Sequence, residues 1–125
     1  MADHTARVTL GSSGLQSTVL GFGGGPLGGF LQAIPEPQAQ ATLERAWDLG
    51  VRLFDTAPFY GYGLSERRVG AMLATRPRDE FVLATKVGKL LRPDATVKDE
   101  QVAGPGGTNM YDGAPALNVA YDYSG

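Results

Sequence analysis

Two stretches decide the predicted fold: Val51-Arg-Leu-Phe-Asp-Thr-Ala-Pro-Phe-Tyr-Gly-Tyr-Gly-Leu-Ser-Glu66 and Phe81-Val-Leu-Ala-Thr-Lys86. Each opens with an apolar run that is typical of a buried strand, and the two runs end at Asp55 and Lys86. Tyr60 lies in the loop that follows the first run. Neighbouring parallel strands bring their C-terminal ends to one edge of a sheet, where sites are built. The spacing therefore predicts that an acid, a phenol and an amine meet there.

A helix is predicted on each side of the first strand. The earlier helix starts at Pro35-Glu-Pro37, since proline is tolerated in a first turn, and Gly50 is its C-cap. The later helix has Ser65 as its N-cap and Glu66 in its first turn, where negative charge is favoured. The apolar positions repeat at helical spacing: Ala39, Leu43, Ala46 and Trp47 in the first helix, and Val69, Met72 and Leu73 in the second.

The N-terminal part predicts a hairpin and one more strand. Residues 7–10 and 15–19 flank the turn Gly11-Ser-Ser-Gly14, a pattern typical of a hairpin. Residues 19–22 follow as a short buried strand, and the order from there to Lys86 is β-α-β-α-β. Short links between alternating strands and helices indicate an α/β fold with a parallel sheet.

The glycine-rich loop after that strand, Gly23-Gly-Gly-Pro-Leu-Gly28, formally fits the pattern G-x-G-x-x-G. Pro26 removes an amide donor, and no helix is predicted to start directly after Gly28. A dinucleotide phosphate loop of the Rossmann type is therefore disfavoured.

The regular pattern ends after Lys86. Residues 90–116 hold several prolines and glycines without a sustained period, and we expect an irregular Gly/Pro-rich loop within a single domain of residues 1–125. Residues 116–123 have the pattern of one further strand. A complete β/α barrel needs roughly 250 residues, about twice the 125 present.

Composition narrows the classes of partner. The 11 Lys and Arg against 13 Asp and Glu give a net charge of −2 without a basic stripe, which argues against nucleic acid. The absence of cysteine excludes disulfides and thiolate metal sites and fits a cytoplasmic location, and no metal site is predicted. No apolar run approaches the roughly 18 residues of a membrane span, and the start lacks the pattern of a signal peptide. The oligomeric state stays open.

The motif residues resemble those of the aldo-keto reductases. The matching positions are Asp55-Thr-Ala, Tyr60-Gly five residues later, Ser65-Glu66 and Thr85-Lys86-Val. The resemblance runs from about Val8 to Lys86 and, more weakly, from Leu117 to Ser124. The loop at 23–28 and the run Ala120-Tyr-Asp-Tyr-Ser124 are similar to the branch of the family that includes dehydrogenases of L-fucose and D-threo-aldoses.

The resemblance implies the fold and the activity. It implies the N-terminal part of a (β/α)8 TIM barrel preceded by a β-hairpin, and NADP- or NAD-dependent oxidation or reduction of a small aldehyde or sugar. Asp55, Tyr60 and Lys86 take the catalytic positions, and Gly23, Gly24 and Asp55 the positions that contact the cofactor. The family's active-site histidine belongs to a later strand; the single histidine here, in the N-terminal tail, does not match it.

The three residue types suit proton transfer to or from a carbonyl oxygen. A free phenol has a pKa near ~10, which is high for exchange at neutral pH. A cation about 4 Å away favours phenolate by roughly 4 kcal/mol at an effective dielectric constant of ~20. We therefore expect that Asp55 keeps Lys86 charged, that Lys86 makes Tyr60 easier to ionise, and that Tyr60 handles the proton.

Alternatives exist at the residue level and for the whole chain. Each residue singly fits an ordinary strand end or surface loop, and Tyr62 shares the setting of Tyr60. Ser65 and Glu66 are expected to be structural, and Trp47 to lie in the core. For the chain, one hypothesis is a truncated oxidoreductase that is inactive alone, and the alternative is a non-catalytic binding or regulatory subunit on the same framework.

Overall fold

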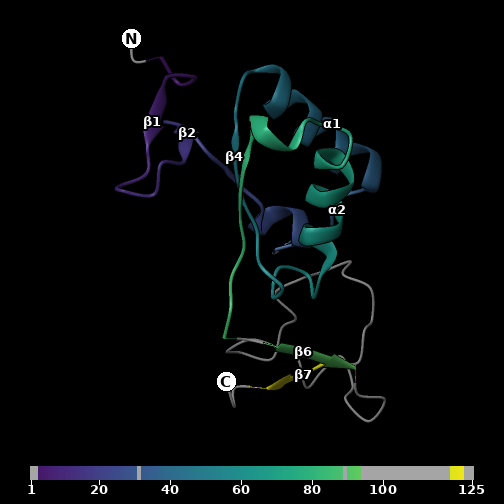
Figure 1. The fold of residues 1–125 in the computed structure, drawn as a ribbon. Helices are drawn as coiled ribbons and strands as arrows, with labels where there is room; N and C mark the ends of the chain where they lie inside the picture. The colour runs from purple at the N-terminus through teal and green to yellow at the C-terminus, as the bar shows by residue number, and fades with distance from the viewer. Residues whose placement is uncertain (1–2, 31, 89, 94–118, 123–125) are drawn as a thin grey trace.

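The computed structural model describes residues 3–30, 32–88, 90–93 and 119–122 (Figure 1). Its first element is the hairpin of β1 (Arg7–Thr9) and β2 (Gln16–Thr18), which pair antiparallel with Arg7 opposite Thr18. The positive φ of 55° at Gly11 and 74° at Gly14 suits glycine at both turn positions. The predicted hairpin is confirmed.

A parallel sheet forms the centre of the described part. Its strands are β3 (Phe22–Gly23), β4 (Leu53–Asp55) and β5 (Val82–Ala84), in the order β3-β4-β5. Gly23 pairs with Asp55, and Asp55 pairs with Ala84, so these three residues form one row across the sheet. The predicted β-α-β-α-β order is confirmed.

The first strand of this sheet starts later than the sequence predicts. Val19 and Leu20 were expected in a buried strand, yet they are 58% and 51% exposed and precede β3. Their amides bond to the carbonyls of Ala6 and His4, at 3.0 Å and 3.3 Å. These residues therefore continue alongside the N-terminal segment, and this tertiary pairing overrides their apolar pattern.

Both predicted helices are present, on one side of the sheet (Figure 1). They are α1 (Glu36–Asp48) and α2 (Leu64–Leu73). The C-cap of α1 is Leu49, one residue before the predicted Gly50. Gly50 follows in the left-handed conformation, with φ of 88° and its amide on the Trp47 carbonyl at 2.9 Å, as is common for the residue after a C-cap. The N-cap prediction for α2 is wrong: Gly63, with φ of 92°, holds that position, and Ser65 lies inside the first turn.

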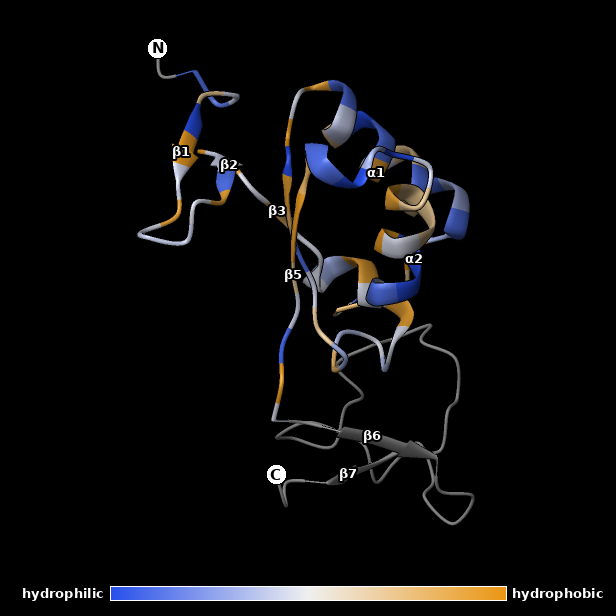
Figure 2. Cartoon of the chain, viewed as in Figure 1, coloured by the Kyte–Doolittle hydropathy of each residue, from blue (hydrophilic) through white to orange (hydrophobic). Residues whose placement is uncertain are grey.

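The core lies between the helices and the sheet. Figure 2 shows hydrophobic and hydrophilic segments mixed along both helices, as expected for helices with one buried face. The buried cluster comprises Leu27, Ala39, Leu43, Trp47, Val51, Phe54, Val69, Met72, Leu73 and Phe81. Trp47 is 8% exposed and stacks on Phe54, with ring centres 6.4 Å apart. The guanidinium carbon of Arg52 lies 3.7 Å from the centre of the Trp47 ring, and that of Arg76 lies 5.2 Å from it.

Two strands beyond the sheet pair with each other. They are β6 (Leu90–Pro93) and β7 (Val119–Asp122), which run antiparallel, with Leu90 opposite Asp122. The strand expected within 116–123 is therefore present. The segment assigned to an irregular loop, 90–116, starts with β6, because its partner lies far along the chain where local periodicity gives no signal. Residues 94–116 of that prediction lie outside the described residues.

Candidate active site

The three predicted catalytic residues lie beside the C-terminal ends of the strands of the parallel sheet. Asp55 is the last residue of β4, and Lys86 follows the end of β5 by two residues. Tyr60 lies in the turn between β4 and α2, where its amide bonds to the Ala57 carbonyl at 3.1 Å and its carbonyl accepts from the Ser65 amide at 3.1 Å. The row of Asp55 and Ala84 brings the two strand ends together, as the sequence predicts.

The ammonium group of Lys86 is the centre of the arrangement. Its Nζ donates to Oδ1 and Oδ2 of Asp55 and to the carbonyl of Thr56, at 2.9 Å in each case. The same Nζ lies 4.9 Å from the centre of the Tyr60 ring, within the range of a cation–π contact. Asp55, Tyr60 and Lys86 therefore form one connected group.

Hydrogen bonding to Asp55 raises the pKa of Lys86 above its ordinary value, and contact with Tyr60 adds to the effect. Desolvation opposes the shift but is smaller than the Asp55 contribution. The lysine is therefore held as a cation. Both side chains of the ion pair are nearly half exposed, Lys86 at 47% and Asp55 at 45%, so the pair orders the site more than it stabilises the fold.

The structure separates Tyr60 from Tyr62. Tyr62 is 5% exposed and has φ of 52°, between Gly61 at 65° and Gly63 at 92°. Positive φ is unusual for a bulky residue, and its ring packs edge-on against Phe59, with centres 5.8 Å apart. The tyrosine beside Lys86 is therefore Tyr60, and Tyr62 is part of the packing of the turn.

A hollow of about 210 Å³ opens next to this group. It is lined by Ala57, Pro58, Phe59, Tyr60, Lys86 and Val87. Its walls are mostly apolar, and the phenol and the ammonium supply the polar groups. Few polar groups in an apolar hollow are typical of sites for small molecules.

The two glycines predicted to contact a cofactor differ in their surroundings. A Cβ added to Gly23 would meet no atom within 4 Å, so the position faces open space beside Asp55. A Cβ on Gly24 would lie 2.7 Å from Ser65 Oγ and 2.8 Å from the Asp55 carbonyl oxygen. Gly24 therefore has a packing reason to be glycine, and its amide donates to that same carbonyl at 2.7 Å.

Ser65 has a role that the sequence did not reveal. It is fully buried, and its Oγ donates to the Gly24 carbonyl at 2.7 Å and lies 2.8 Å from Thr56 Oγ1. Glu66, the next residue, accepts a bond of 2.6 Å from Thr85 Oγ1, just before Lys86. The first turn of α2 therefore connects the glycine loop to the end of β5 through these two side chains, although Ser65 is not the predicted cap.

The described residues show neither a metal centre nor a membrane-spanning helix. No cluster of three or more His, Asp or Glu side chains in that part of the chain is arranged to hold a metal ion. Neither α1 nor any other helix there has the length and apolar character needed to cross a bilayer.

Comparison with known proteins finds one matching family and several named relatives. Residues 19–113 match the sequence model described as the aldo/keto reductase family. D-threo-aldose 1-dehydrogenase of a Pseudomonas species is 53% identical over 83 residues, which are 66% of this chain and 25% of that protein. Pyridoxal 4-dehydrogenase of Microbacterium luteolum is 40% identical over 118 residues, which are 92% of this chain and 34% of that protein.

Solved structures agree with the sequence match. An aldo-keto reductase from Bacillus halodurans, in its holo form, superposes with a TM-score of 0.59 at 37% identity over 66% of this chain and 26% of that one. The predicted fold class is thereby confirmed as the N-terminal part of a (β/α)8 barrel, although the residues described here form no closed barrel. The chain spans between 25% and 34% of the length of the curated relatives named above.

Proposed function

Because this chain belongs to the aldo/keto reductase family, we propose that the protein containing it is an NADP- or NAD-dependent oxidoreductase of aldehydes or aldoses in the cytoplasm. Two similar proteins are named as dehydrogenases of a D-threo-aldose and of pyridoxal, which supports a small aldehyde or sugar as substrate. The observation that carries the proposal is Lys86, bound to both carboxylate oxygens of Asp55 and placed beside the Tyr60 ring.

Each residue has a distinct role in this proposal. Tyr60 holds or releases a proton at its hydroxyl oxygen, next to the reacting carbonyl or alcohol oxygen. Lys86 places its positive charge beside the phenol ring, where a cation can stabilise negative charge that develops on the oxygen atoms during the reaction. Asp55 orients Lys86 and keeps it protonated, consistent with the raised pKa of the lysine.

The nicotinamide cofactor supplies or accepts the hydride. The residues present fit such a group, because Gly23 leaves open space at the strand end, in register with Asp55. Gly23, Gly24 and Asp55 would contact it, and the apolar hollow beside Tyr60 would receive the substrate.

We also propose that residues 1–125 do not turn over substrate by themselves. Among the described residues, the lining of the hollow comes from the β4–α2 turn and from residues 86 and 87. Catalysis of this kind depends on exclusion of water and on fixed geometry, which further barrel segments would provide.

An assay with a panel of aldoses and small aldehydes tests the proposal. The full-length product of the gene is assayed with NAD and with NADP, and the 125-residue chain is assayed in parallel. We expect turnover with one of the cofactors by the gene product and none by the chain. Cofactor binding by the gene product without turnover of any substrate would instead favour the non-catalytic binding or regulatory role.

A further inference from the structure

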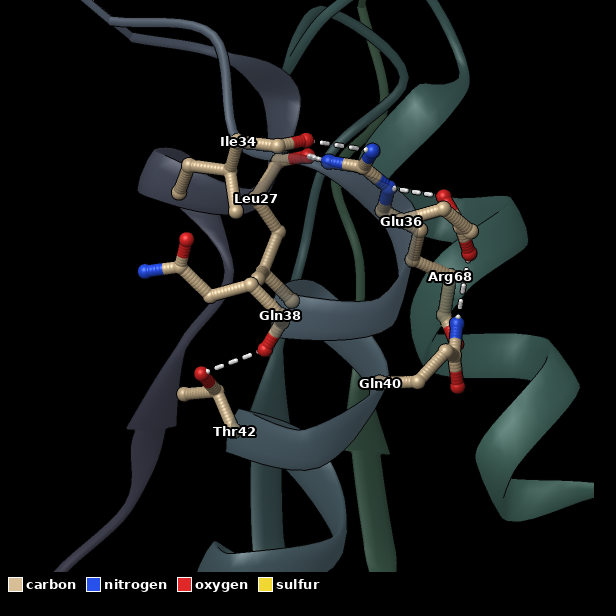
Figure 3. Close-up of polar contacts among 7 residues, drawn as sticks. All are labelled: Leu27, Ile34, Glu36, Gln38, Gln40, Thr42 and Arg68. Carbon is tan, nitrogen blue, oxygen red and sulfur yellow. Dashed lines mark hydrogen bonds and ion pairs between the residues drawn. The ribbon is translucent and has the colours of Figure 1, made fainter.

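A buried arginine on α2, outside the group around Lys86, makes an unusually complete set of bonds (Figure 3). Arg68 is 6% exposed. Its Nη1 donates to the Leu27 carbonyl at 2.8 Å, its Nη2 to the Ile34 carbonyl at 2.8 Å, and its Nε to Glu36 Oε2 at 2.7 Å. All three guanidinium nitrogens are therefore used, in the planar fork that only arginine provides.

These bonds fasten the connection between β3 and α1. Leu27 belongs to the 3₁₀ turn η1 (Gly25–Gly28), and Ile34 lies just before α1. One side chain from α2 thus holds both ends of this connection through main-chain carbonyls. The side chain of Glu36 is 57% exposed. The bonds from Arg68 to the two main-chain carbonyls are therefore better protected from solvent than its ion pair with Glu36.

The turn held by Arg68 lies directly against Tyr60. A Cβ added to Gly28 would lie 2.8 Å from the Tyr60 carbonyl oxygen, so the two backbones are in contact. A Cβ added to Gly25 would lie 3.8 Å from Cζ of the Tyr60 ring. The two ends of η1 therefore bound Tyr60, one at its main chain and the other at the face of its phenol.

We propose that Arg68 is a positioning residue for Tyr60, acting through η1. The role of Arg68 in catalysis rests on the proposed function, whereas its role in placing Tyr60 does not. Arg68 holds Leu27, the adjacent Gly28 presses on the backbone of Tyr60, and Gly25 limits the movement of its ring. Without Arg68, η1 would be free to shift, and the phenol would lose its fixed place relative to Lys86.

The experiment compares Arg68→Met with Arg67→Met in the full-length product of the gene. Arg67 is the exposed neighbour on the same helix, so its replacement removes an equal charge without touching η1. Hydrogen exchange of peptides covering residues 24–30 and 57–64 is measured, together with kcat, its pH profile and cofactor affinity. Arg68→Lys, which keeps the charge but not the fork, is the second variant if Arg68→Met does not fold.

We expect faster exchange in both peptides for Arg68→Met and a fall in kcat of about 10- to 100-fold, with cofactor affinity changed less than about threefold. The pH profile of kcat should shift, because displacement of the phenol changes its distance from the Lys86 ammonium group. A smaller folded fraction would instead lower the rate by the same factor at all pH values. Arg68→Lys should lie between Arg68→Met and the parent, and Arg67→Met should match the parent.

Unchanged exchange in residues 57–64, or an equal effect of Arg67→Met, would overturn the proposal. A rate that falls without a change in the shape of the pH profile would do so too. Absence of turnover in the parent protein would count against the proposed function alone, because the exchange of the two peptides still decides whether Arg68 positions Tyr60.

Discussion

At the scale of single residues, the ammonium group of Lys86 shares its three hydrogens among three acceptors, two of them on Asp55. This bonding leaves the lysine little freedom to rotate away from Tyr60. The Asp55 carboxylate therefore both keeps Lys86 protonated and fixes the direction of the lysine side chain.

Replacing Asp55 by Asn should lower the pKa of Lys86, because bonding to Asp55 is the largest cause of the present rise. A raised pKa in the folded state stabilises the fold at pH values below the ordinary lysine value of 10.5, and the stabilisation is lost as the pH rises through the raised value. At pH values below 10.5, Asp55→Asn should therefore lower the free energy of unfolding by about 0.2–1 kcal/mol, since the ion pair is half exposed.

NMR titration of the lysine side chain and urea unfolding at several pH values check this expectation. Glu66→Gln is the matched control, because Glu66 is a nearby carboxylate that bonds Thr85 instead of Lys86. An unchanged Lys86 titration in Asp55→Asn would contradict the assigned cause.

Tyr60→Phe should reduce turnover of the full-length gene product by about 100-fold or more, because a general acid or base contributes on this scale. The cofactor should still bind, as the change removes one oxygen atom that is not assigned to cofactor binding. Turnover assays and a fluorescence titration with the cofactor make the measurement. Tyr62→Phe is the comparison, and an equal loss there would remove the distinction between the two tyrosines.

The residues at strand ends could be predicted from the sequence because their placement follows from the strand pattern. Asp55 and Lys86 each close an apolar run, and parallel strands leave few ways to arrange them. Arg68 escaped notice because a helix with adjacent arginines at 67 and 68 looks exposed. Its spacing of four from Met72, which belongs to the predicted apolar stripe, was the one signal for a buried position.

At the scale of elements, the β3–α1 and β4–α2 connections pack directly against each other, because glycines occupy the contact positions. Gly28 and Gly61 touch through their backbones, so a side chain on either one would overlap the other. The turn at 61–63, with three consecutive positive φ values, takes its shape from this contact and from its two glycines. Two loops that are distant in sequence therefore behave as one unit around Tyr60.

Gly28→Ala should destabilise the fold by about 1–3 kcal/mol, because the added methyl group overlaps the main chain of the neighbouring loop. Gly70→Ala should stabilise it by up to about 1 kcal/mol, since Gly70 lies in α2, is exposed, and has no atom within 4 Å of an added Cβ. Urea unfolding of both variants of the full-length gene product makes the comparison. Equal effects of the two substitutions would contradict the described loop contact.

The helices were predictable because helical periodicity is local, whereas caps and strand starts depend on tertiary contacts. Ser65 has the composition of an N-cap, but its hydroxyl is used by Gly24 and Thr56, and Gly63 begins the helix instead. In the same way β3 starts at Phe22, because the preceding residues bond to the N-terminal segment.

At the scale of the whole molecule, the described parallel sheet is open. β3 and β5 are its edges among the residues that the structure describes, and each edge presents unpaired main-chain groups there. Leu83 on β5 is 41% exposed and Leu49 at the end of α1 is 46% exposed. Open edges and uncovered apolar side chains favour association.

The isolated 125-residue chain should therefore bind a hydrophobic dye and either aggregate or unfold without a cooperative transition. Size-exclusion chromatography and thermal unfolding by circular dichroism, with the full-length gene product as the reference, make the measurement. A monomer with a single cooperative transition would show that the open sheet is stable without further strands.

These 125 residues contain a single tryptophan, and its position in the core makes its fluorescence a probe of the packing there. Trp47 lies in α1 and packs against Phe54 of β4 and against Phe81, the residue just before β5. Its emission therefore reports the integrity of the helix–sheet interface. In the 125-residue chain, emission without any added label can thus show whether a substitution near Tyr60 also loosens the packing of the helices on the sheet.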